Sequence, residues 1–149
     1  MTDRLYLLNA DWFDDQGGPW YCPPGARIEG VLSLYPRLRE QVQVTHLDHP
    51  RPRAAVVAEV GEANQSCPLL VLDGEFDWPD AQVSAETGAG FLQDDDILPY
   101  WAARYGIGRP HPCRCPSPDG RSWPEGPDEG RREPRRLTPT DAFDPHPFA

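Results

Sequence analysis

The 149-residue chain contains no lysine, so all of its permanently cationic side chains are arginines. Without a lysine ammonium group, the protein cannot form a Schiff base with a carbonyl substrate or use lysine as a general base. A GC-rich genome is the simplest explanation for this bias.

Long hydrophobic runs are also missing, and no segment approaches the roughly 20 residues of a membrane-spanning helix. The apolar run over residues 5–8 is too short for a signal peptide, and acidic residues follow it closely. We therefore expect a protein of the reducing bacterial cytoplasm. The four cysteines are then more often reactive or incidental than joined in structural disulfides.

Basic residues are outnumbered, with 14 arginines against 24 acidic residues and a formal net charge of −10. Residues 1–107 carry the entire excess, and this acidity disfavours nucleic acid and anionic membrane surfaces as partners. The chain also lacks a Gly-rich phosphate loop, a Gly-x-Ser-x-Gly elbow and a His-Glu-x-x-His motif.

Aliphatic residues are scarce after residue 107, where Leu137 is the only leucine, isoleucine, valine or methionine. Ten of the 19 prolines lie in this same segment. It cannot bury enough apolar surface to offset the entropy cost of ordering. We predict a folded domain over residues 1–107 and a Pro- and Arg-rich disordered tail over residues 108–149.

Within residues 1–107, the hydrophobic pattern predicts an α/β domain. Short apolar runs indicate strands, and apolar residues at i, i+3, i+4 and i+7 indicate helices. Residues 9–18 and 73–89 are interpreted as polar loops. The predicted strands cover residues 5–8, 42–48, 69–72 and 90–93, and the predicted helices cover 23–35 with a further turn near 38, 51–60 and 95–105.

Cys22 lies where the first helix begins, within Tyr21-Cys22-Pro23-Pro24-Gly25. Proline suits the first helical turn, where no intrahelical N–H is needed. The free N–H groups and the helix dipole favour an anion at this end, which increases the thiolate fraction. Cys22 is therefore a candidate nucleophile, although a dispensable remnant of a thiol site would have the same sequence.

The order of elements, with Cys22 at the first helix and Pro68 at the third strand, resembles the thioredoxin superfamily. Glutaredoxins and the N-terminal domain of glutathione transferases are the most similar forms, and residues 95–106 are similar to the last helix of that transferase domain. The resemblance implies a four-stranded mixed sheet flanked by helices. Residues 1–107 also resemble a bacterial domain-of-unknown-function family with this fold, through residues 28–30, 51–53 and 61–68.

Two positions depart from these families. Thioredoxin-type enzymes carry Cys-x-x-Cys, and Gly25 replaces the second cysteine, so the usual dithiol cycle cannot operate. Glutathione-binding relatives often carry an acidic residue and serine at the start of the last helix, where this chain has Asp94 and Asp95. Two carboxylates can still accept from an ammonium group. The resemblance thus allows glutathione as a ligand only with a changed site, and no other cofactor is expected.

The resemblance also gives Cys67 a role. In this fold, the residue before the proline at the strand start faces the thiol at the helix start, and that proline is usually cis. Cys67 could then replace the missing second cysteine by pairing with Cys22. The alternative is that Cys67 is a small buried apolar residue, as free cysteines often are.

Other clusters have simpler interpretations. His111, Cys113 and Cys115 provide only three cramped ligands for zinc, and no metal is expected. The His46-Leu47-Asp48-His49 segment suggests either a metal patch or a solvated strand end. Arg51 and Arg53 suggest either a carboxylate site or a solvated first helical turn.

Two functions remain open. The first is thiol redox or thiol-transfer chemistry, with Cys22 as nucleophile, Cys67 as its partner and Pro68 shaping the groove. Tyr21, Pro23, Asp94 and Asp95 would then contact the substrate, a protein or a small thiol. The second is a redox-inactive binding module that uses the same groove.

Overall fold

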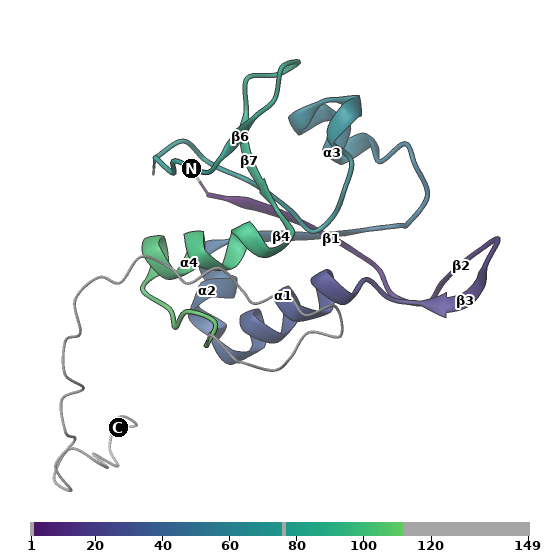
Figure 1. Cartoon of the computed structure of the whole chain (residues 1–149), viewed down its shortest axis with the longest axis horizontal. Coiled ribbons are helices and arrows are strands. Elements are labelled where there is room, and N and C mark those ends of the chain that lie inside the picture. The colour runs from purple at the N-terminus through teal and green to yellow at the C-terminus, as the bar shows by residue number, and fades with distance from the viewer. Residues whose placement is uncertain (1, 76, 112–149) are drawn as a thin grey trace, which may run out of the picture. The chain divides into compact units, whose positions relative to one another are not determined.

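A five-stranded mixed sheet is the centre of the structure, a computed structural model that describes residues 2–75 and 77–111 (Figure 1). Its strand order is β4-β1-β5-β7-β6. β1 is parallel to β4 and antiparallel to β5, and β7 is antiparallel to both β5 and β6. The strands are β1 (Arg4–Leu8), β4 (Gln43–Leu47), β5 (Leu69–Val71), β6 (Gln82–Val83) and β7 (Gly90–Gln93).

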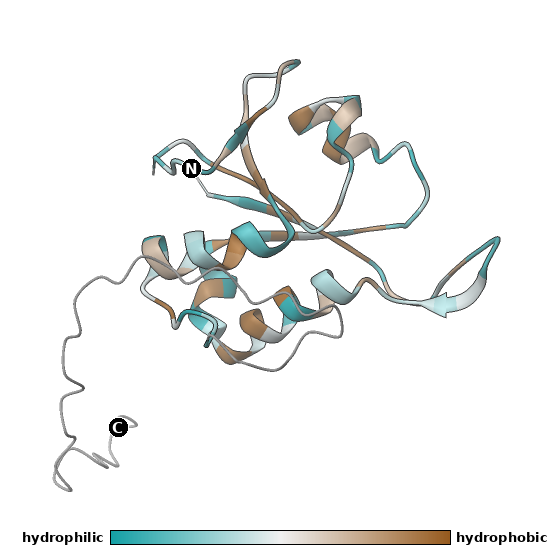
Figure 2. Cartoon of the chain, viewed as in Figure 1, coloured by the Kyte–Doolittle hydropathy of each residue, from teal (hydrophilic) through white to brown (hydrophobic). Residues whose placement is uncertain are grey.

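Helices cover both faces of this sheet (Figure 1). One face carries α1 (Pro23–Leu34), α2 (Pro36–Gln41) and α4 (Ile97–Tyr105), and the other carries α3 (Ala54–Val60). Each face has its own core, because successive strand residues point to opposite faces. Leu5 and Leu7 pack under α1 and α4, whereas Tyr6 packs under α3. Figure 2 shows hydrophobic residues concentrated in the central strands and on the helices.

Prolines set the bounds of the first two helices. Pro23 and Pro24 occupy the first turn of α1, and Pro36 ends that helix and begins α2. Both placements follow from the missing N–H of proline, which costs nothing in a first turn but breaks a helix interior. The predicted helix end near residue 35 and the further turn near residue 38 are therefore confirmed.

The expected number of four strands in the sheet is wrong, because β6 adds a fifth at the edge. β6 has only two residues, both exposed, so it gives no hydrophobic pattern that could reveal it. The predicted loop over residues 9–18 also contains structure. It forms most of a two-stranded antiparallel hairpin, β2 (Trp12–Asp14) and β3 (Gly17–Trp20).

The helix predicted over residues 51–60 begins at Ala54 instead. Arg53 precedes it with a non-helical backbone (φ −93°, ψ 85°), and its N–H donates to the Gln65 side chain at 2.7 Å. From residue 112 onwards, the predicted tail lies outside the described residues. Within the described ranges, no helix is long and apolar enough to cross a membrane.

Glu59 connects α3 to the sheet and makes stability depend on pH. Arg4 donates to its two carboxylate oxygens at 2.6 and 2.8 Å, and the Tyr6 hydroxyl donates at 3.0 Å. These bonds, chiefly those from Arg4, hold the pKa of the Glu59 carboxyl below its ordinary value. Its stabilising effect is therefore present above the unfolded-state pKa and is lost as pH falls through the lower folded-state pKa.

Glu59→Gln should accordingly be less stable than the wild type at pH 7, by about 1 kcal/mol. Urea unfolding at a series of pH values should show this difference shrinking as the pH falls below about 4. Glu40→Gln is the matched control, because Glu40 is exposed on α2. A difference for Glu59→Gln that stays constant down to pH 3 would contradict the role of the carboxylate charge.

Candidate functional site

The thiol of Cys22 caps the N-terminus of α1. The Gly25 backbone N–H donates to Cys22 Sγ at 3.4 Å, and the side chain is half-buried. A Cβ atom at position 25 would lie 3.3 Å from the Cys22 Cβ, closer than an ordinary contact, so glycine lets the helix start pack closely against the Cys22 side chain. The predicted helix start at Cys22 is confirmed, and the sulfur lies where a helix provides free N–H groups.

Cys67 and Pro68 lie beside Cys22, although 45 residues separate the two cysteines. The Cys22 thiol donates to the Cys67 carbonyl oxygen at 3.7 Å. The peptide bond between Cys67 and Pro68 is cis. Both cysteines are free and half-buried, and Cys67 packs against the core under α3. The structure thus brings Cys22, Cys67 and Pro68 together at one end of β5.

Two arginines hold the segment that leads into Cys67. Arg53 is 7% exposed, and its guanidinium donates to the Gln65 carbonyl and, at 2.6 Å, to the His49 carbonyl. Arg51 donates to the Ser66 hydroxyl at 3.5 Å. The interpretation of Arg53 as part of a solvated turn is therefore wrong. The two carbonyl groups belong to His49 in the same loop and to Gln65 in the loop before β5, and the local sequence contains no sign of these bonds.

The Arg53 guanidinium also acts on the Cys67 thiol. Burial raises the pKa of Cys67 above its ordinary value, and the positive charge of Arg53 opposes that increase. Cys22 and Arg51 are the other titratable groups that affect this thiol. Arg53 Nε is buried and has no hydrogen-bond partner among the described residues. The guanidinium therefore retains a donor for an anion that forms nearby.

Arg53→Met should raise the pKa of Cys67 further. In a chain whose other three cysteines are replaced by serine, alkylation of Cys67 at a fixed pH should slow several-fold, because less of the thiol is ionised. Arg53→Lys should restore most of the rate, because it keeps the charge. Arg51→Met is the control and should change the rate by less than about twofold, since exposed charges interact weakly. Equal rates for Arg53→Met and the wild type would contradict the assignment.

The acidic residues at the start of the last helix lie on the β7 side of the site. Asp94 and Asp95 belong to the short 3-10 turn η2 (Asp94–Asp96), and the Asp94 N–H donates to the Pro68 carbonyl at 3.2 Å. Burial raises the pKa of the Asp94 carboxyl. Asp95 pairs with Arg27 of α1. Asp94 is thus adjacent to Pro68, whereas the carboxylate of Asp95 already has a cationic partner.

The other predicted residues are exposed or have partners elsewhere. Tyr21 and Pro23 adjoin Cys22 in the chain, and both are exposed, Tyr21 to 64%. His46 contacts Glu29 at 2.6 Å, and the described residues contain no group of metal-ligating side chains. His111 is exposed, whereas Cys113 and Cys115 lie outside the described residues.

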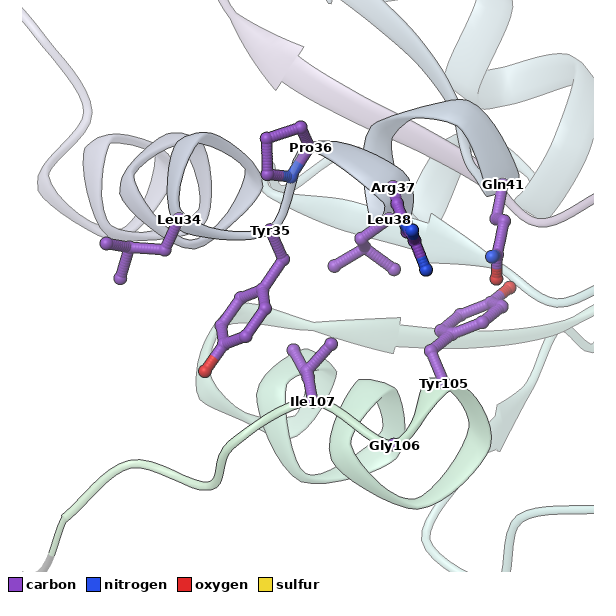
Figure 3. A pocket seen from close by; sticks show the side chains of 9 residues that line it. All are labelled: Leu34, Tyr35, Pro36, Arg37, Leu38, Gln41, Tyr105, Gly106 and Ile107. Atoms are coloured by element: carbon purple, nitrogen blue, oxygen red, sulfur yellow. The ribbon is translucent and has the colours of Figure 1, made fainter. Parts of the chain in front are cut away.

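An open pocket of about 460 Å³ lies at the opposite end of α1, away from the cysteines. Figure 3 shows Tyr35, Leu38, Tyr105 and Ile107 lining it where α1 meets α2 and where α4 ends. α1 has 12 residues and is therefore about 18 Å long, so this pocket is not part of the cysteine site.

The fold and the site define a mixed α/β protein with two neighbouring free cysteines at a helix start and a strand start. The chain belongs to the family described as "Protein of unknown function (DUF3088)", whose match covers residues 2–109. No curated protein and no solved structure matches the chain.

Proposed function

We propose that this protein has a thioredoxin-like fold and carries out thiol–disulfide exchange through Cys22. The observation that carries the proposal is the position of the Cys22 sulfur, which accepts from a helix N-terminal N–H and lies 3.7 Å from the Cys67 carbonyl oxygen. The order and directions of the strands support the fold assignment. β1 is parallel to β4, whereas β5 is antiparallel to both of its neighbours, β1 and β7.

The reaction begins with the Cys22 thiolate attacking one sulfur of a substrate disulfide. A bond forms between Cys22 and that sulfur, the substrate bond breaks, and the other substrate sulfur leaves as a thiolate that takes up a proton. The Cys67 thiolate then attacks Cys22 Sγ and releases the second substrate thiol, which leaves a Cys22–Cys67 disulfide. Two equivalents of an external thiol, such as glutathione, reduce this disulfide and are themselves oxidised to a disulfide.

The surroundings of the cysteines suit a substrate disulfide formed by the thiol of a protein or by a small thiol. Arg53 stabilises the Cys67 thiolate that the second step requires. Asp94 lies next to Pro68 and can accept from a substrate ammonium or amide group. Tyr21 and Pro23 are exposed beside Cys22 and so are available for contact with the substrate. We place the reaction in the cytoplasm, whose thiol pool would supply the reductant.

The test is the reduction of 2-hydroxyethyl disulfide coupled to glutathione or to a dithiol, measured for the wild type and for Cys22→Ser. Activity in the wild type that is lost in the variant supports the exchange reaction. Activity in neither form would instead favour a redox-inactive binding module.

A further inference from the structure

The β2–β3 hairpin is attached directly to the cysteine site. It extends away from the sheet and from the helices (Figure 1), and its last strand residue, Trp20, is separated from Cys22 by a single residue, Tyr21. A molecule bound along this hairpin would therefore lie next to the Cys22 thiol. Because the hairpin projects, it suits the surface of another macromolecule better than an enclosed small ligand.

The hairpin has a defined shape. The Trp12 ring stacks on His49 with centroids 4.7 Å apart, and Trp20 Nε1 donates to Asp14 at 3.1 Å. The Asp11 N–H donates to the Trp20 carbonyl at 2.7 Å. Gly18 has φ +140°, and a Cβ there would lie 2.7 Å from the Trp12 carbonyl, so the close approach of the strands requires glycine. These contacts hold the β2–β3 hairpin in one conformation before any partner binds.

The hairpin and the residue that follows it expose three aromatic side chains to different extents within residues 2–75 and 77–111. Phe13 is 70% exposed, Tyr21 is 64% exposed and Trp20 is 42% exposed. Aromatic side chains clustered at a surface are typical of protein interaction sites, because their burial contributes much of the binding energy. Their position beside Cys22 links this surface to the reaction.

The charge of the hairpin determines what can bind it. Residues 9–22 contain Asp11, Asp14 and Asp15 and no basic residue. Carboxylates and aromatic faces both attract cations, through ion pairs and cation–π contacts. Nucleic acids and anionic lipid surfaces are repelled by the same carboxylates. A cationic stretch of polypeptide can pair with the carboxylates and also contact the aromatic rings.

We propose that the β2–β3 hairpin is a docking arm for an arginine- or lysine-rich segment of a protein, which it holds next to Cys22. The statement that the docked segment presents a sulfur to Cys22 rests on the proposed function. The docking itself does not, and it can be measured without any reaction.

The test uses short synthetic peptides that are identical except that arginine, glutamine or glutamate flanks a central serine. Titration calorimetry with the full chain should show binding of the arginine peptide on the order of tenfold tighter than the glutamine peptide at low salt. The preference should shrink as salt is added, because exposed charges are screened. Equal affinities for the three peptides would overturn the docking arm even if Cys22 proves reactive.

Two variants locate the binding surface. Asp11→Asn/Asp15→Asn should weaken binding of the arginine peptide by several-fold. The matched control is Asp77→Asn/Asp80→Asn, which removes the same charge from an exposed loop that follows the other end of β5. Equal losses in both variants would show a general effect of net charge and would overturn the proposal.

The same peptides with cysteine in place of serine, each carried as a mixed disulfide with thionitrobenzoate, test presentation to Cys22. Attack of the Cys22 thiolate on the peptide sulfur releases the coloured thionitrobenzoate thiolate, and the arginine peptide should react fastest. No reaction together with selective binding would contradict the proposed function and leave docking supported. A concentration-dependent dimer that dissociates in Asp11→Asn/Asp15→Asn would assign the arm to a second copy and overturn the proposal.

Discussion

Replacing Cys22 with serine is expected to lower the rate of disulfide reduction by on the order of 100-fold or more. The proposed reaction needs a sulfur nucleophile to attack the disulfide, and a serine hydroxyl is a far weaker nucleophile toward sulfur. The Gly25 N–H that donates to Cys22 Sγ remains in the variant, so α1 keeps its cap and the fold is preserved. The measurement is the initial rate of 2-hydroxyethyl disulfide reduction at several pH values.

Cys67→Ser separates the two steps of the reaction. The first attack by Cys22 should still occur, and the mixed disulfide should accumulate, because no second thiol releases the substrate. The intact mass of the protein, measured without a reductant, should increase by the mass of one half of the substrate disulfide, bound to Cys22. Cys113→Ser/Cys115→Ser is the control for the remaining thiols and should keep the wild-type rate. A Cys22→Ser variant as active as the wild type would exclude Cys22 as the nucleophile.

The helices and the main strands follow closely from local sequence patterns. Apolar residues at helical spacing together with Pro23 and Pro36 fix the bounds of α1, and the continuous apolar run after Pro68 marks β5. β6 and the hairpin were missed because short exposed strands carry no such pattern. Their backbone hydrogen bonds depend on a partner strand, which a local window does not contain.

The candidate site is only partly visible in the sequence. Cys22 and Pro68 lie at element boundaries that local patterns mark, and the thioredoxin resemblance suggested that Cys67 faces Cys22. The structure brings these three residues together. Arg53 was missed because its guanidinium is held by the His49 carbonyl and by the Gln65 carbonyl, which belongs to a separate loop. An arginine beside a proline gives no local signal that distinguishes it from an exposed one.

A buried carboxylate near the N-terminus has the largest expected effect on stability. Asp3 is fully buried, and it accepts from the Tyr100 hydroxyl at 2.9 Å, the Tyr105 hydroxyl at 2.8 Å and the Asp73 N–H at 3.0 Å. Burial and the bond to Asp3 raise the pKa of both tyrosine hydroxyls, which therefore remain donors at neutral pH. Arg104 donates to Asp73 at 3.0 and 2.7 Å and completes the network.

This network joins β1, the segment after β5 and α4, so its loss should loosen three elements at once. Asp3→Ala removes the acceptor of two tyrosine hydroxyls and one backbone N–H from a position that is fully buried. We expect a loss of about 3–5 kcal/mol in the free energy of unfolding, measured by guanidinium denaturation at pH 7. Asp3→Asn keeps the shape and one acceptor oxygen, and it should lose about 1–3 kcal/mol.

Asp48→Ala is the matched control, because Asp48 is exposed and accepts from the Asn9 side chain at 2.9 Å. It should lose no more than about 0.5 kcal/mol, as exposed substitutions usually do. The contrast isolates burial, since the same chemical group is removed in both variants. If Asp3→Ala unfolds within about 1 kcal/mol of the wild type, then the buried carboxylate does not hold α4 against the sheet, and packing of Trp101 and its neighbours is sufficient.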